Sequence, residues 1–373
     1  MVASGTQWPE RTSAYFLSNP VIMFNRRGPF SDQVEHLGIE TVILPYPVMM
    51  LKEAFTPGGL NTVQKASREF ERYIAAHPVD LIHCSDVLVL LFIARAVRKR
   101  HLRVVYNLIF KYEWTRMVLF NLYAATMIES IIAHSPMIAA DCKHRTVGLS
   151  KKVHTIPLGV DPAIYRPRKK DEENLLRIIS GVSPDVKFVG MVGRFDPVKG
   201  HDLFLRVAKR VLAMRQDVTF FCIGGSVLVN QIQGALRYRE KILALHRNLQ
   251  LADRLIFIDE HTDVPALIRS LDLLVCPSQS EGFGLVVLEA LTSGVPVIAS
   301  RSVGAVEYLD EEPALFIADS HNVDSFARSI LQVLEHLDHS NEHYTVSERL
   351  VQRFTWQSHA AECERVYEGS APR

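Results

Sequence analysis

The chain has 373 residues, of which 48 % are hydrophobic and 22 % charged, a composition typical of globular proteins with room for two domains of ordinary size. The formal net charge of +1 gives no bulk electrostatic reason to expect nucleic acid as a partner. The five cysteines are scattered without metal-ligand spacing, the opening residues lack the pattern of a signal peptide, and the longest apolar run, residues 87–94, is too short to span a bilayer. We therefore expect a cytoplasmic protein with reduced cysteines.

Short apolar runs alternate with amphipathic segments in the first half of the chain, as in consecutive βα units. The apolar runs occupy residues 21–24, 41–44, 80–84, 104–110 and 130–134. Helical patterns cover residues 30–37, 59–77, 87–100 and 112–129. The stretch 161–173 is rich in proline and charge, and we expect it to be a linker.

The second half repeats this alternation, which predicts a second α/β domain. We expect strands at residues 186–192, 218–223, 255–258, 273–276 and 295–299, and an amphipathic helix at 354–367. The loop after the first of these strands, residues 193–200, carries Arg194 and Lys199, and the second strand ends at Gly224 and Gly225.

The stretch 277–290, which reads PSQSEGFGLVVLEA, is the most informative part of the chain. It follows a predicted buried strand, turns at Gly282 and Gly284, and begins a helix near Leu285. Free backbone N–H groups and the helix dipole both point into such a turn, which favours an anion. Glu281 and Glu289 lie on either side of the helix start, where a carboxylate is unfavourable unless a hydroxyl group needs an acceptor. A strand–helix junction with a solvent-facing glutamate is the alternative.

The sequence Glu281-Gly282-Phe283-Gly284, followed by Glu289, resembles the Glu-x7-Glu signature of retaining, nucleotide-sugar-dependent glycosyltransferases of family 4. The resemblance implies the GT-B fold, an α/β architecture in which two Rossmann-like, doubly wound domains face each other across a cleft. The expected domains are residues 1–163 on the acceptor side and residues 164–352 around the nucleotide sugar. Residues 353–373 would form a helix that crosses back to the first domain.

The resemblance also implies roles for individual residues. Glu281 would hold the donor sugar and Glu289 the ribose hydroxyls, while Arg194 and Lys199 would stabilise the departing diphosphate without a metal. For the two cations, a surface turn with solvated charges is the alternative. His83 would touch the donor sugar, unless it is only a structural histidine at a strand end. Around the nucleotide, the family pattern marks Gly193, Gly224, Gly282, Phe283, Gly284, Leu285 and Val286.

One family feature is not recognisable in this sequence. Relatives carry a first strand and a glycine-rich loop, whereas residues 1–20 show no convincing strand and one glycine, Gly5. Because the first strand is central in a doubly wound sheet, we expect a missing or degenerate first βα unit and a weakened first domain.

Other signals exclude or leave open further functions. The cations Arg95, Arg98, Lys99, Arg100 and Arg103 would suit anionic lipid headgroups, but a solvated helix end is the more common interpretation. No Asp-x-Asp triplet is present, which argues against metal-dependent, single-Rossmann glycosyltransferases. No Gly-x-Gly-x-x-Gly begins a first strand, which argues against an NAD dehydrogenase.

These observations predict transfer of a sugar from a UDP- or GDP-sugar to a hydroxyl acceptor with retention of configuration, in the synthesis of a polysaccharide, glycolipid or other glycoconjugate. The acceptor would be a sugar, a lipid-linked group or another hydroxyl, and neither metal, cofactor nor nucleic acid is expected. Two alternatives stay open: a nucleotide-sugar-binding protein with impaired catalysis, and a sugar-nucleotide epimerase on the same fold. A peripheral contact with the cytoplasmic face of the membrane also stays open.

Overall fold

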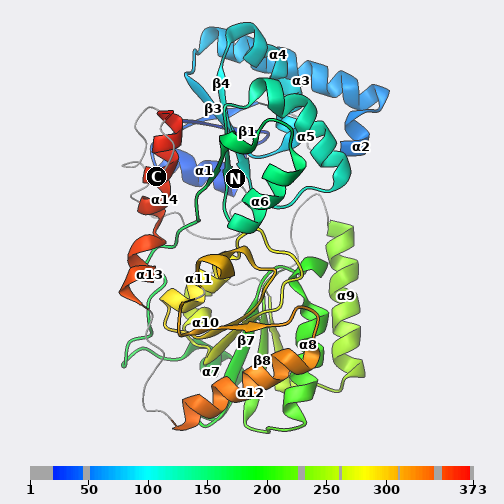
Figure 1. The fold of residues 1–373 in the computed structure, drawn as a ribbon. Helices are drawn as coiled ribbons and strands as arrows, with labels where there is room; N and C mark the ends of the chain where they lie inside the picture. Colours follow the sequence, from blue (N-terminus) through cyan, green and yellow to red (C-terminus); the bar gives the residue numbers. More distant parts are fainter. Residues whose placement is uncertain are drawn as a thin grey trace. The chain divides into compact units, whose positions relative to one another are not determined.

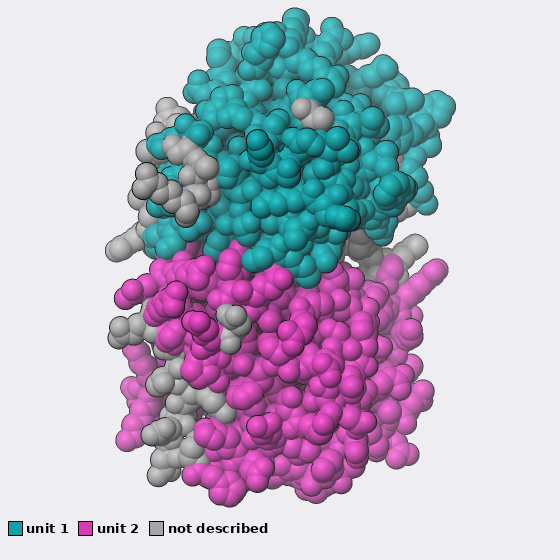
Figure 2. All heavy atoms as spheres, viewed as in Figure 1, with its two compact units in different colours: residues 1–157, 357–373 teal, residues 158–356 magenta. Residues whose placement is uncertain are grey.

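The computed structural model describes residues 20–44, 51–225, 232–259, 263–309, 311–339 and 347–369. The chain divides into two compact units: unit 1 comprises residues 1–157 and 357–373, and unit 2 comprises residues 158–356 (Figures 1 and 2). Each unit combines helices with parallel strands, so the predicted α/β class is confirmed. Helix α14 (Trp356–Tyr367) lies in unit 1 from residue 357 on, although it follows unit 2 in the sequence.

Unit 1 contains two parallel sheets among its described residues. The larger has the order β3-β4-β5-β6 (Leu81–Cys84, Arg103–Leu108, Ser130–Ala133, Val153–Thr155), and the smaller pairs β1 (Val21–Phe24) with β2 (Glu40–Ile43). The helices before α14 are α1 (Pro29–His36), α2 (Leu51–Ala54), α3 (Pro57–Ala76), α4 (Val87–Arg100), α5 (Trp114–Met127) and α6 (Pro136–Arg145), with a 3-10 turn at Ser150–Lys152. Helices α3, α4 and α5 share a core with the larger sheet around Phe92, Tyr106 and Phe120.

Each sheet of unit 1 has an open strand edge within the described part of the chain. Strand β1 pairs with β2 alone, and β3 pairs with β4 alone. Strands β4 and β5, which have neighbours on both sides, are almost entirely buried, whereas every residue of β1 is half-buried. No described strand joins the two sheets. Residues 1–19, where the sequence predicts a missing or degenerate first strand, lie outside the described residues.

Unit 2 is built on one six-stranded parallel sheet with the order β12-β11-β10-β7-β8-β9. Its strands are β7 (Lys187–Val192), β8 (Val218–Ile223), β9 (Leu255–Ile258), β10 (Leu273–Cys276), β11 (Val297–Ser300) and β12 (Leu315–Ala318). Its helices are α7 (Leu175–Ser180), α8 (His201–Leu212), α9 (Ile232–Asn248), α10 (Val264–Ile268), α11 (Leu285–Thr292), α12 (Val323–His339) and α13 (Glu348–Arg353), with 3-10 turns at Pro197–Lys199, Ala252–Arg254 and Gly304–Tyr308. The strand order reverses at β7, which lies between β8 and β10.

Both faces of the unit 2 sheet are covered by helices. Successive side chains of a strand point to opposite faces. Phe221 accordingly packs in a cluster with residues of α10 and α11, whereas Phe220 packs in a cluster with residues of α8 and α12. Burial on both faces explains why these strands are continuous apolar runs in the sequence. The strands predicted at 218–223, 255–258 and 273–276 are confirmed at those bounds.

Candidate active site in unit 2

The carboxyl ends of β7 and β10 lie side by side, because these strands are paired with Leu273 opposite Val189 and Leu274 opposite Gly190. In open α/β sheets, ligands bind at the carboxyl ends of the strands where the strand order reverses. The loop 193–200 follows β7 at this edge, and the turn 277–284 follows β10. The predicted residues of the two segments therefore meet at one place.

Glycines allow the backbone segments at this edge to approach closely. Gly200 has a φ of +78°, and a Cβ atom on it would lie 2.4 Å from the carbonyl oxygen of Pro277. Gly224 has a φ of +144°, and a Cβ atom there would lie 2.2 Å from the carbonyl oxygen of Gly193. A larger residue at either position would push apart the loops that follow β7, β8 and β10.

Lys199 and Glu281 form an ion pair that joins the two predicted segments. Lys199 Nζ lies 2.5 Å from Glu281 Oε2, and the Ser278 hydroxyl donates to the same oxygen at 3.3 Å. Burial disfavours the charge on Lys199, but the carboxylate of Glu281 outweighs this effect and raises the pKa of Lys199. The two side chains remain 24 % and 19 % exposed, so a solute can reach the pair.

The turn between β10 and α11 is fixed by hydrogen bonds to the segment after β11. Glu281 N donates to Ser302 O at 3.1 Å, and Ala305 N donates to Phe283 O at 2.7 Å. Gly284 begins α11 with a φ of +91°, a conformation that few side chains tolerate. Leu285 and Val286 follow in the first turn, where a helix leaves its backbone N–H groups without partners of its own.

Arg194 lies in the loop after β7 and is half-buried. Its charge acts on Lys199, which places the two cations in the same electrostatic environment. Behind them, the buried ring of His201 stacks on Phe195 with the ring centroids 4.8 Å apart. Burial lowers the pKa of His201 to about 4, so this ring is neutral at physiological pH and adds no third positive charge.

Glu289 lies just over one turn into α11 and is only 9 % exposed. Burial raises its pKa to about 7, although a hydrogen bond from Tyr165 and the charge of Lys199 act in the opposite direction. Burial, and then the neighbouring Glu289, raise the pKa of Tyr165, which therefore acts as a donor to the carboxylate. Glu289 is thus a buried carboxyl group that titrates near neutrality, and the sequence alternative of a solvent-facing glutamate is wrong at this position.

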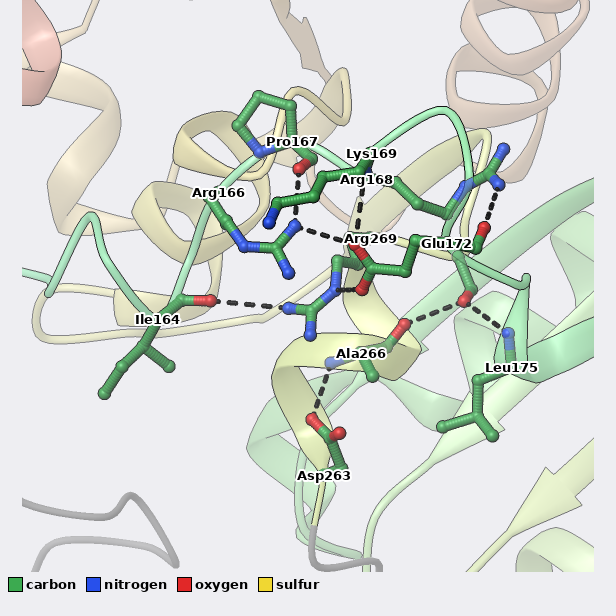
Figure 3. A network of polar contacts seen from close by, with 11 residues as sticks. Ile164, Arg166, Pro167, Arg168, Lys169, Glu172, Leu175, Asp263, Ala266 and Arg269 are labelled. Carbon is green, nitrogen blue, oxygen red and sulfur yellow. Dashed lines mark hydrogen bonds and ion pairs between the residues drawn. The ribbon is translucent and has the colours of Figure 1, made fainter.

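A network of ion pairs holds the segment that carries Tyr165 (Figure 3). Glu172 accepts hydrogen bonds from Arg166 Nη1 at 2.7 Å and from Arg269 Nε at 2.6 Å. Arg269 also donates to the carbonyl oxygen of Ile164 at 3.3 Å. The bond from Arg166, supported by Arg269, lowers the pKa of Glu172 to about 2. Tyr165 was missed in the sequence, because residues 161–173 have only the proline and charge content of a linker.

His83 belongs to unit 1, whereas the other predicted catalytic residues belong to unit 2. It is the third residue of β3, and its Nδ1 lies 2.7 Å from the hydroxyl of Tyr367 in α14. This bond fits a histidine that fixes α14 on the sheet, and a contact with the donor sugar stays a prediction. In the part of the chain that the structure describes, no group of three or more His, Cys, Asp or Glu side chains is arranged to hold a metal ion.

Comparison with known proteins places these features in a family. Residues 173–345 match the family model "Glycosyl transferases group 1". The lipopolysaccharide core biosynthesis mannosyltransferase LpsB of Rhizobium meliloti is 39 % identical over 165 residues, which cover 43 % of this chain and 44 % of that protein. D-inositol 3-phosphate glycosyltransferase of Salinispora tropica is 28 % identical over 248 residues, 64 % of this chain and 50 % of that protein. The chain thus spans about half the length of the curated relatives it matches.

Solved structures resemble the chain over nearly its whole length. Alr3699/HepE of Anabaena, solved with UDP and glucose, matches with a TM-score of 0.80 at 20 % identity and covers 99 % of this chain and 98 % of its own. Sucrose-phosphate synthase of Thermosynechococcus elongatus matches with a TM-score of 0.72 at 21 % identity, over 89 % and 83 % of the two chains. The chain is therefore an α/β protein of the GT-B class. The match to glycosyl transferases group 1 covers residues 173–345, which lie in unit 2.

Proposed function

We propose that this chain is a retaining glycosyltransferase that moves a sugar from a nucleoside diphosphate sugar to a hydroxyl acceptor. The observation that carries the proposal is the Lys199–Glu281 pair beside the start of α11, at the reversal point of the unit 2 sheet. A cation, a carboxylate and the first amides of a helix at one edge suit a molecule that combines phosphate groups with hydroxyl groups.

In this proposal the diphosphate binds the amides of Leu285 and Val286 together with Arg194 and Lys199. Binding draws Lys199 from Glu281 toward the phosphates, and Glu281 then accepts hydrogen bonds from the sugar hydroxyls. Neither charge is left buried and unpaired during this exchange, which would otherwise be unfavourable. Glu289 accepts the ribose hydroxyls from its buried position on α11.

The proposed reaction breaks the bond between the anomeric carbon and a diphosphate oxygen, and that oxygen keeps the electron pair. The acceptor oxygen bonds to the same face of the anomeric carbon and passes its proton to the departing diphosphate. Because negative charge on the diphosphate grows during bond breaking, Arg194 and Lys199 stabilise the transition state more than the bound donor. The proposal assigns no role to a metal.

The relatives guide the choice of donors to test. The Anabaena neighbour was solved with UDP-glucose, and the Rhizobium relative is a mannosyltransferase. We infer that a UDP- or GDP-hexose is the donor and that the acceptor is a sugar, a lipid-linked group or another hydroxyl in glycoconjugate synthesis.

Calorimetry and product analysis with UDP-glucose and GDP-mannose test this function. Glu281→Ala and Glu289→Ala should each weaken donor binding by about 10-fold or more, because hydrogen bonds to a charged group contribute about 1.5–3 kcal/mol. Glu240→Ala, which removes an exposed carboxylate of α9, is the matched control and should leave affinity unchanged. Unchanged affinity in both site variants would refute the site, and an isomerised donor sugar in place of a transferred one would indicate an epimerase.

One observation favours a second candidate, a nucleotide-sugar-binding protein with impaired transfer. The glycine-rich loop that relatives carry after the first strand is not recognisable in the sequence of residues 1–20, whereas the signature residues Glu281 and Glu289 of unit 2 are present. Donor binding of wild-type affinity without any transfer product, tested over a panel of acceptors, would support this candidate.

We also propose a cytoplasmic location with a peripheral membrane contact, but not through Arg95, Lys99 and Arg103 of the cationic cluster in the sequence. Arg95 and Lys99 of that cluster both pair with Glu71, at 3.1 and 2.8 Å, and Arg103 pairs with Glu129 at 2.7 Å. Paired cations are less available to lipid headgroups. No helix in the described ranges is both long and apolar enough to cross a bilayer.

A further inference from the structure

Helix α5 of unit 1 presents a stripe of exposed apolar side chains. Trp114, Val118 and Leu122 follow one another at intervals of four residues and therefore lie on one face of the helix. Their exposed fractions are 74 %, 43 % and 66 %. Trp114 begins the helix, so a large aromatic ring stands at one end of the stripe.

Two neighbouring apolar residues extend this stripe. Val147 is 85 % exposed, and its backbone N–H donates to Asn121 Oδ1 on α5 at 3.3 Å, which brings it beside the helix. Phe110, 47 % exposed, precedes the helix in the loop after β4. We call Phe110, Trp114, Val118, Leu122 and Val147 together the α5 surface.

The α5 surface is not needed for the core of unit 1. The opposite face of α5 already packs into that core through Met117, Phe120 and Ala124. A helix on the surface of a globular protein normally has polar residues on its outer face. A contiguous exposed apolar face of this kind indicates a binding surface.

Cations surround the α5 surface. Lys111 is exposed just before the helix and Arg116 is half-buried in its first turn. Arg98 of α4 reaches the far end, where it lies 5.8 Å over the ring of Tyr123 and donates to Thr126. Exposed Lys143 in the last turn of α6 and Lys151 lie in the segments that flank Val147.

Acidic groups compensate little of this positive charge. Glu113 is exposed at the start of α5, and exposed Asp86, before α4, acts on Tyr112 together with Arg116. Asp141 of α6 is paired with Arg145 at 3.2 Å. Arg145 also donates to the carbonyl oxygen of Tyr112 at 2.6 Å, so its charge is directed into the protein. The border of the surface therefore has a net positive charge.

We propose that the α5 surface docks on an anionic lipid bilayer. Its apolar side chains would enter the boundary between headgroups and acyl chains, Trp114 would take the interfacial position that indole rings favour, and the surrounding cations would bind the headgroups. A second copy of this chain fits less well, because a symmetric contact would bring the two sets of cations together. Phe110 follows the carboxyl end of β4, the side of a parallel sheet on which ligands bind, so docking would place this edge near a membrane-anchored acceptor.

Vesicle flotation tests the docking. We expect the full chain to bind vesicles that contain about 30 % phosphatidylglycerol more tightly than vesicles of phosphatidylcholine alone. Trp114→Ser combined with Leu122→Ser should lower this binding by about 10-fold or more, because both variants remove apolar area that enters the bilayer. Lys111→Glu combined with Arg116→Glu should also lower vesicle binding, by about fivefold or more for each cation, and this loss should be larger at low salt than at high salt.

The matched control is Ile178→Ser combined with Met214→Ser, which removes two apolar residues of unit 2 that are 60 % and 62 % exposed. This control should bind like wild type. The tryptophan fluorescence of the wild-type chain should shift to the blue on anionic vesicles, and Trp114→Phe should abolish this shift. This measurement does not depend on how well the serine variants fold. No binding at low salt, equal losses in the control, or a dimer that the serine variants convert to monomers would overturn the proposal. The docking does not depend on the proposed transferase function, so loss of one leaves the other testable.

Discussion

Glu289→Gln should stabilise unit 2 at alkaline pH while weakening nucleotide binding. Burial raises the pKa of Glu289 from its ordinary value of 4.5 to about 7. A group whose pKa is raised by folding contributes its full stability below the unfolded value and loses it as pH rises through the folded value. The folded state therefore loses stability progressively as pH rises from about 4.5 to about 7, and an uncharged glutamine of the same shape removes this effect.

The size of the effect follows from the two pKa values. Their difference corresponds to about 3 kcal/mol between pH 4.5 and pH 8, which is an upper value because water can enter around the carboxylate. We expect a gain of up to about 3 kcal/mol for the glutamine variant at pH 8 and only about 1 kcal/mol at pH 5. Donor affinity should change in the opposite direction, because glutamine offers the ribose a neutral acceptor in place of a charged one.

Hydrogen exchange of the peptide that covers β10 and α11 measures this stability locally, which matters in a chain with two units. Wild type, Glu289→Gln and the control Glu240→Gln would be compared at pH 5 and pH 8, and calorimetry with UDP would give the affinities. A glutamine variant that exchanges faster than wild type at pH 8, or that gains the same protection at both pH values, would refute the reasoning. Tighter UDP binding in that variant would refute the ribose role.

Three further predictions concern the same edge of the sheet. Arg194→Ala and Lys199→Ala should lower turnover by about 100-fold or more but donor affinity much less, since the diphosphate charge grows in the transition state. Steady-state kinetics and separate binding measurements test this, and a loss of affinity without a loss of turnover would contradict it. Transfer should persist in excess chelator, because the proposed charge stabilisation uses Arg194, Lys199 and helix amides; activity lost on chelation and restored by Mn²⁺ would show that a metal does this work. Gly200→Ala should abolish UDP binding and lower the thermal stability by more than Gly181→Ala does. Both glycines have positive φ (+78° and +64°), but only at Gly200 would a Cβ atom lie 2.4 Å from Pro277 O. Equal effects of the two substitutions in calorimetry and thermal melting would show that backbone strain matters and the close approach does not.

The sequence predicted the strands of unit 2 well and the contacts of the site poorly, for a physical reason. Runs such as 218–223 and 273–276 are buried on both faces, so their composition alone identifies them. The Lys199–Glu281 pair joins residues 82 positions apart, and it depends on β7 and β10 being neighbours in the sheet. The bond of Tyr165 to Glu289 depends likewise on where the segment 158–175 is held, which the ion pairs of Glu172 decide. Local patterns do not encode such pairings.

The first strand expected in unit 1 shows another limit of sequence patterns. The sequence patterns indicated β1 and β3 but no first strand in residues 1–20, and since residues 1–19 lie outside the described part of the chain, this expectation stays a prediction. Backbone N–H and C=O groups at an open edge need partners, either water or another strand. The residues proposed to bind the diphosphate and the ribose all belong to unit 2, so nucleotide binding is expected to depend less on the first strand of unit 1 than the transfer step does.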